Sequence, residues 1–168
     1  QQAASAARRS SLRRFPGGDC RGPAELRAEA QGRRIRIAAG QCLELRRAHA
    51  FAPAEIERVE IEAAPLSLNL TGKKEPKDFY EAQVSLYHWA AAALHHNRAG
   101  LYEASEACVH DPAVIALRQR ITAIAVEDLQ PDEARAAVLL RDGRRIEAQV
   151  RPHIGSAGRP LSDEQLQA

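Results

Sequence analysis

Residues 81–96 carry the most informative hydrophobic pattern in the chain, because this stretch is apolar on nearly every side of a helix. A helix without a polar face is expected to be buried, since an exposed helix keeps polar residues on one side. Three polar side chains, Ser85, Tyr87 and His88, nevertheless lie inside the apolar stretch. A buried polar group needs a hydrogen-bond partner or a function. The pattern therefore predicts a buried helix and singles out these three residues.

Alternating apolar and polar residues predict strands on both sides of this helix. Residues 57–62 alternate before the helix, and residues 121–126 form a short apolar strand after it. Asp142-Gly143, a dipeptide typical of tight turns, separates residues 136–141 from residues 144–151 and predicts a hairpin. The inward-facing residues of its second strand are expected to be Ile146, Ala148 and Val150.

Capping and turn residues predict the remaining elements. Asp111-Pro112 is a typical helix start, with a capping carboxylate followed by proline at the first helical position. The other expectations are a short helix from Gln41 through His49, a loop over residues 64–77, a helical stretch from about Tyr102, and a final helix capped by Ser162 and Gln165. The order predicts an α+β fold: a mainly antiparallel sheet of about four strands with helices packed on one face.

Composition restricts the class of protein. The 168 residues are 45% hydrophobic but only 4% aromatic, so a core has to be built mostly from Ala, Leu, Ile and Val. The three cysteines are far apart and form no Cys-x-x-Cys pair, which argues against a disulfide framework or an iron–sulfur cluster. Reduced thiols, the lack of a membrane-spanning run and the lack of a secretory signal predict a cytoplasmic protein without a membrane partner.

Charge divides the chain into two unlike segments. Residues 1–47 hold eleven arginines against four acidic residues, whereas residues 48–168 hold thirteen basic and eighteen acidic residues. Residues 1–41 contain few large apolar side chains and no clear period, so we expect a basic, poorly ordered segment there. Nucleic acid is not the expected partner, because the arginines are not accompanied by a binding module. Residues 42–168 are the predicted folded domain.

Several motifs in residues 42–168 resemble one enzyme family. The segment Glu81-Ala-Gln-Val-Ser-Leu-Tyr-His-Trp-Ala-Ala-Ala-Ala-Leu94 is similar to the signature helix of the MmgE/PrpD family. The segments Asp111-Pro-Ala-Val-Ile-Ala-Leu117 and His153-Ile-Gly-Ser-Ala-Gly-Arg-Pro-Leu-Ser-Asp163 follow in the order and approximate spacing of that family's C-terminal half. Residues 17–41 do not follow the family pattern.

The resemblance implies a function and an incomplete site. The family includes 2-methylcitrate dehydratases, cis-aconitate decarboxylases and iminodisuccinate epimerases, which act on small di- or tricarboxylic acids without a cofactor. Its members have a large helical domain and a smaller α+β domain, with the active site between them. This chain is similar to the smaller domain alone. The expected partners are therefore a polycarboxylate substrate and a helical domain in cis or in trans, or a second copy of the chain. The alternative is a catalytically silent remnant or an association module.

His88 is the first candidate for catalysis, assisted by Tyr87 and Ser85. An imidazole titrates near neutral pH, so a partly desolvated histidine that faces another domain can bind or protonate a carboxylated substrate. A nucleophilic Ser85–His88 pair has no acidic partner in the pattern. The competing interpretation is that His88 is a core histidine bonded to a backbone carbonyl.

Two further segments are candidates for substrate binding. Lys73 and Lys74 lie just before the signature helix, where positive charge attracts carboxylates, although a solvated loop is the common alternative. Gly155, Ser156 and Arg159 follow the last strand, where backbone N–H groups and a guanidinium can approach a carboxylate. No metal site is expected, because His88 and His95 are separated by roughly 10 Å along a helix and adjacent His95 and His96 are expected to diverge. Cys42 and Cys108 are expected to be inert core residues.

Overall fold

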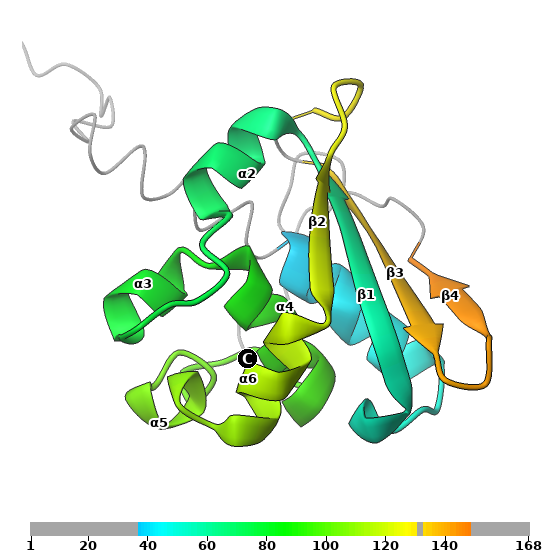
Figure 1. Ribbon diagram of the computed structural model, residues 1–168, viewed down its shortest axis with the longest axis horizontal. Helices are drawn as coiled ribbons and strands as arrows, with labels where there is room; N and C mark the ends of the chain where they lie inside the picture. Colours follow the sequence, from blue (N-terminus) through cyan, green and yellow to red (C-terminus); the bar gives the residue numbers. More distant parts are fainter. Residues whose placement is uncertain (1–36, 131–132, 149–168) are drawn as a thin grey trace, which may run out of the picture.

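The computed structural model describes residues 37–130 and 133–148 (Figure 1). Helices and strands alternate irregularly along the chain, as in an α+β fold. In order, the elements are a helix over residues 37–48, the 3-10 helix η1 (Pro53–Glu55), β1 (Ile56–Ala63), α2 (Pro65–Thr71), α3 (Phe79–Gln83), α4 (Leu86–His96), α5 (Glu106–Val109), α6 (Pro112–Gln119), β2 (Ile121–Ala125), β3 (Ala134–Leu140) and β4 (Arg145–Glu147).

The four described strands form one sheet in the order β2-β1-β3-β4. β1 pairs antiparallel with β3, and β3 pairs antiparallel with β4 through the turn at Asp142-Gly143. β1 and β2 are parallel, because the chain between them crosses over through helices α2 to α6. The sheet is therefore mixed, with two antiparallel pairs and one parallel pair, and the predicted α+β class is confirmed.

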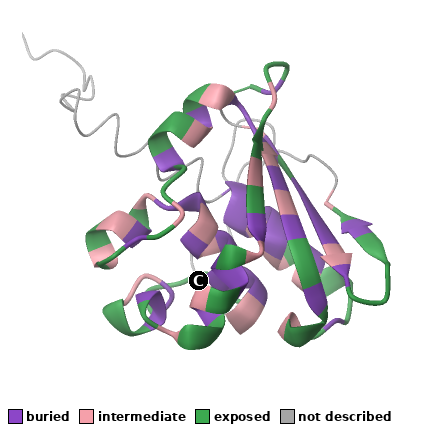
Figure 2. Ribbon diagram, in the orientation of Figure 1, coloured by how far each residue is buried: buried purple, intermediate pink, exposed green. Residues whose placement is uncertain are grey.

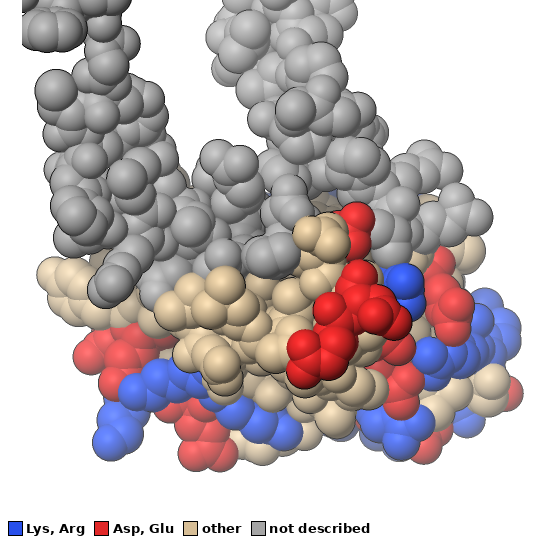
Figure 3. Space-filling view, turned by 90° about the horizontal axis from the view of Figure 1, so that it is seen from above, with Lys and Arg blue, Asp and Glu red and all other residues tan. Residues whose placement is uncertain are grey.

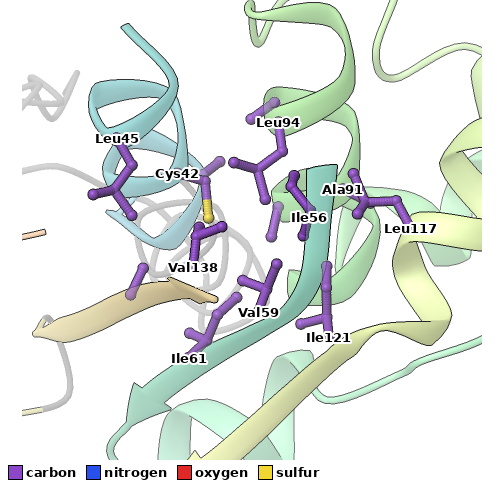
Figure 4. Close-up of a cluster of buried hydrophobic side chains, with 14 of the residues drawn as sticks. Cys42, Leu45, Ile56, Val59, Ile61, Ala91, Leu94, Leu117, Ile121 and Val138 are labelled. Carbon is purple, nitrogen blue, oxygen red and sulfur yellow. The ribbon is translucent and has the colours of Figure 1, made fainter. Parts of the chain in front are cut away.

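One face of the sheet is apolar and packs against helices. Val59, Ile61 and Ala63 alternate with charged residues along β1, and all three are buried. A bulge between Ile56 and Arg58 adds one residue to β1, so Ile56 faces the same core despite its different parity. Figure 4 shows side chains of the 37–48 helix, α4 and α6 meeting these strand residues in a single core. The predicted placement of helices on one face is confirmed.

Charged side chains of β1 occupy the opposite face of the sheet, and Figure 2 shows more exposed residues alternating with buried ones along this strand. Arg145 on β4 reaches across β3 to Glu60 on β1, with 2.6 Å between Nη1 and the carboxylate oxygen. On β3, Ala137 is the partner of Glu60 and Leu139 is the partner of Arg145, so this ion pair runs diagonally across the strand. Basic and acidic side chains also lie beside one another on the surface seen from above, where described residues are visible (Figure 3).

The single helix predicted over residues 81–96 is wrong, because the structure divides it in two. α3 ends at Gln83, Val84 is not helical, and Ser85 caps the beginning of α4. The Ser85 side chain competes with the helical backbone for hydrogen bonds, which favours a cap over a helix interior. The predicted burial is confirmed for α4, where seven residues are buried: Leu86, His88, Ala90, Ala91, Ala92, Ala93 and Leu94.

The loop predicted over residues 64–77 is also wrong, because it contains α2. Pro65 occupies the first turn of that helix, where its missing N–H costs no hydrogen bond. The helix ends at Gly72, whose N–H donates to Leu68 O at 2.7 Å. The proline and glycine that suggested a loop are the two ends of a short helix.

The other predicted elements that fall within the described residues are present with shifted ends. Residues 101–104 form turns, and α5 begins only at Glu106, capped by Ser105. α6 begins after Asp111, whose carboxylate accepts from Ala113 N–H at 2.8 Å, as predicted. Val150 and the predicted helix start at Ser162 lie outside the described residues. Every described helix is too short or too polar to cross a membrane.

Candidate functional site

Ser85 links the loop that contains Lys73 and Lys74 to the beginning of α4 by two hydrogen bonds. Its Oγ accepts a hydrogen bond from His88 N–H at 3.1 Å and donates to the carbonyl of Lys73 at 2.5 Å. The side chain is fully buried, so both hydrogen bonds lie away from solvent. Ser85 therefore holds two of the predicted substrate-binding and catalytic segments together, and its hydroxyl has its proton committed to Lys73.

His88 is fully buried in the described structure. Its Nε2 lies 2.7 Å from the carbonyl oxygen of Glu103, so Nε2 carries the proton and donates it. Burial lowers the pKa of His88, although the hydrogen bond to Glu103 opposes this, and electrostatic interactions with Arg118 and His96 lower it further. The ring is consequently neutral at pH 7. Its Nδ1 lone pair has no hydrogen-bond partner among the described residues.

Glu103 is a buried carboxylate whose negative charge is balanced by Arg98. The residue is only 1% exposed, and its carboxylate accepts from Arg98 Nε at 2.7 Å and from Gly100 N–H at 2.8 Å. Burial raises the pKa of Glu103, but these hydrogen bonds outweigh it and the pKa lies below its ordinary value. The tight turn over residues 97–105 thereby fixes the carbonyl that His88 contacts.

Arg118 adds a buried positive charge to the same region. It extends from α6, which packs against α4, and its Nη2 donates to Val109 O at 3.1 Å. Its Nη1 and the indole Nε1 of Trp89 have no hydrogen-bond partner within the described ranges. Neither Glu103 nor Arg118 was predicted. The available signal was the position of Arg118, which follows the buried residues Val114 and Leu117 on one face of α6.

The lysines before α3 are largely committed to neighbouring groups. Lys73 forms an ion pair with Glu81, whose pKa is lowered mainly by this hydrogen bond. Lys74 Nζ lies 3.3 Å from Gln119 O and 5.7 Å from the centre of the Tyr87 ring. Lys74 and Tyr87 are both half-buried and contact each other, and Lys73 is exposed.

The structure brings together some, but not all, of the predicted site residues. Ser85, Tyr87 and His88 gather at the beginning of α4 with Lys73 and Lys74 beside them. His88 is fully buried in the interior and does not lie on an open surface. Gly155, Ser156 and Arg159 lie outside the described residues.

A second group with ligand chemistry lies at the opposite end of α4. His95, His96 and Asp111 each offer one ligand atom, and these atoms lie within 4.8 Å of one another. The two rings are 4.7 Å apart between centroids, so the expected divergence of the adjacent histidines does not separate them. Cys108 Sγ lies 3.6 Å from His96 Nε2, and burial raises the pKa of this thiol to about 11. Cys42 is buried in the core, which raises its pKa to about 12.

Comparison with known proteins identifies the domain. The family model described as the MmgE/PrpD C-terminal domain matches residues 32–168. The interpretation that residues 17–41 do not follow the family pattern is therefore wrong for residues 32–41, and residues 37–41 belong to the first described helix. None of the curated proteins matches the chain.

Proposed function

Because this chain belongs to the MmgE/PrpD family, we propose that it supplies the small α+β domain of a lyase or isomerase that acts on small di- or tricarboxylic acids. In reactions of this class, the enzyme moves a proton of the substrate at a position next to a carboxylate, as in a 2-methylcitrate dehydratase-like hydro-lyase. The family match over residues 32–168 is the observation that carries the proposal.

The beginning of α4 is the proposed contribution to the active site. Lys74 lies over the exposed side of Tyr87, and the Ser85 cap holds the lysine-containing loop in place. An ammonium group near a phenol offers charge and a hydrogen-bond donor to a carboxylate. Lys73 supports this surface more weakly because Glu81 neutralises it. Gly155, Ser156 and Arg159 are proposed as further carboxylate contacts.

His88 is proposed as the proton-transferring group, through Nδ1, which has no hydrogen-bond partner in the part of the chain that the structure describes. A neutral imidazole can accept a proton at this lone pair, and the lowered pKa of His88 keeps the ring unprotonated at pH 7. For Nδ1 to meet a substrate, the surface next to α4 has to open or to be completed by another domain. We propose a helical domain in cis or in trans, or a second copy, as that partner.

The free thiols of Cys42 and Cys108 support a cytoplasmic location of the protein.

The test supplies a helical domain in trans. The full chain is assayed alone and mixed with a helical domain of the same family, using 2-methylcitrate, cis-aconitate and iminodisuccinate as substrates. Turnover is expected only in the mixture and is expected to fall at least tenfold in His88→Gln, because glutamine keeps a donor for Glu103 but is no base. His49→Gln, at an exposed histidine, is the matched control and is expected to retain full activity.

A silent remnant or association module is the second candidate. The hydrogen bond from His88 to the Glu103 carbonyl, together with the full burial of the ring, favours this alternative, because a core histidine has the same geometry. Stable binding of the helical domain without turnover of any of the three acids would support the second candidate and overturn the first.

A further inference from the structure

The junction between α4 and α6 holds a group of ligating side chains that the proposed reaction does not use. His95 and His96 form the last turn of α4, and Asp111 immediately precedes α6. The two helices pack against each other, which brings residues separated by fifteen positions of the chain to one place. All three residues are half-buried.

The distances suit a single ion after a small rearrangement. The three ligand atoms lie within 4.8 Å of one another. Nitrogen and oxygen ligands of a tetrahedral zinc ion, each about 2.0–2.2 Å from the metal, lie roughly 3.4 Å apart. Rotation of half-buried side chains by about an ångström at their tips closes the difference, with no change in the backbone.

Neighbouring contacts already orient two of the three side chains. One carboxylate oxygen of Asp111 is fixed by Ala113 N–H at 2.8 Å, which leaves its other oxygen available. The His96 ring lies between Cys108 Sγ, 3.6 Å from Nε2, and the Tyr102 ring, whose centroid is 5.5 Å away. The macrodipole of α4 accounts for histidines at its carboxyl end, but it does not require a carboxylate from a second element beside them.

We propose that His95, His96 and Asp111 bind one first-row divalent cation of the zinc or cobalt class. Two imidazoles and one carboxylate are a ligand set typical of such ions, and they leave at least one position for water or an anion. The site lies at the opposite end of α4 from Ser85, so it is separate from the proposed substrate surface. Cys108 contacts His96 and serves as an orienting neighbour.

Titration of the full chain with cobalt(II) tests this site. Cobalt in a tetrahedral or five-coordinate protein site gives visible absorption that the hydrated ion lacks, so binding is observed without any enzyme assay. Calorimetry with zinc(II) measures the affinity and stoichiometry. We expect one ion per chain, with the affinity lowered at least tenfold in His96→Ala and in Asp111→Asn.

Asp111→Asn is the variant that separates binding from folding. An asparagine oxygen accepts the hydrogen bond from Ala113 N–H as aspartate does, and asparagine is an equally good helix cap, so α6 is retained. His49→Ala is the control for loss of an exposed histidine elsewhere and is expected to bind as the parent does. Absence of the visible absorption, or equal zinc affinity in the parent, Asp111→Asn and His96→Ala, would overturn the proposal.

Discussion

His88 couples the stability of the domain to pH. Its pKa is lowered in the folded state by burial, so between that pKa and the ordinary value near 6.5 the unfolded chain binds more protons. Stability therefore rises with pH in this range and is lost as the pH falls below about 6.5. We expect the free energy of unfolding, measured with urea at pH 5, 6 and 7, to decrease toward pH 5, and this decrease to be smaller in His88→Gln.

The control for this measurement is another histidine. His49→Gln removes an exposed imidazole and is expected to leave the pH dependence of the unfolding free energy unchanged. The comparison uses the slope against pH rather than the stability at one pH, because His88→Gln also alters packing. An equal slope in His88→Gln and the parent would show that the pKa of His88 is the same in the folded and the unfolded chain.

Ser85 contributes to stability through two buried hydrogen bonds. Ser85→Ala removes the cap of α4 and leaves the Lys73 carbonyl without its donor. Loss of a cap typically costs about 0.5–2 kcal/mol, and we expect the upper part of that range in urea unfolding because the site is buried. Ser105→Ala is the matched control, since that cap of α5 is a long contact of 3.4 Å to Cys108 N–H. A cost no larger than that of Ser105→Ala would contradict this role.

At the level of elements, alanine substitutions at two glycines show whether backbone conformation or lack of space makes a glycine necessary. Among the described residues, apart from the adjacent residues and the backbone of the glycine's own helix, no atom lies within 4 Å of the position that a Cβ would take at Gly40 or at Gly143. Gly143 has φ +87°, which an L-residue adopts only with strain, so Gly143→Ala is expected to destabilise the hairpin by about 1 kcal/mol. Gly40 lies within the first described helix, where alanine is preferred, so Gly40→Ala is expected to stabilise by about 0.5–1 kcal/mol.

Urea unfolding of the two alanine variants provides the measurement. Opposite signs of the change in unfolding free energy are expected, because available space is the same and backbone conformation differs. Stabilisation by Gly143→Ala would mean that the turn relaxes to a negative φ at little cost.

Elements set by local patterns could be predicted from the sequence, whereas features set by distant contacts could not. The alternation in β1 and the Asp111-Pro112 start of α6 are local, and both are confirmed. The parallel pairing of β1 with β2 joins residues about sixty positions apart and leaves no local pattern. Ser85 and Pro65 are ambiguous locally, because each residue type occurs both in loops and at helix starts. The buried partners Glu103 and Arg118 also depend on the packing of distant segments.

At the scale of the whole molecule, an exposed apolar surface lies where α2 meets the edge strand β2. Leu66 and Leu70 are one helical turn apart on α2 and remain 52% and 38% exposed, and Ile124 on β2 is 39% exposed. α2 and β2 are in contact, and β2 pairs only with β1 among the described strands. An unpaired strand edge beside large apolar side chains favours association with another polypeptide.

We therefore expect the chain to self-associate when no helical domain is supplied. Sedimentation velocity over a range of concentrations should show a rising average mass, and Leu66→Lys with Leu70→Lys should shift the chain toward the monomer. The paired charges repel a second apolar copy but lie on the solvent side of α2, so the fold is retained. Tyr80→Lys on α3, at a residue 77% exposed, is the control for added charge and is expected to change nothing. A parent chain that stays monomeric at all concentrations would show that this surface binds no second copy, because association by burial of these leucines has to depend on concentration.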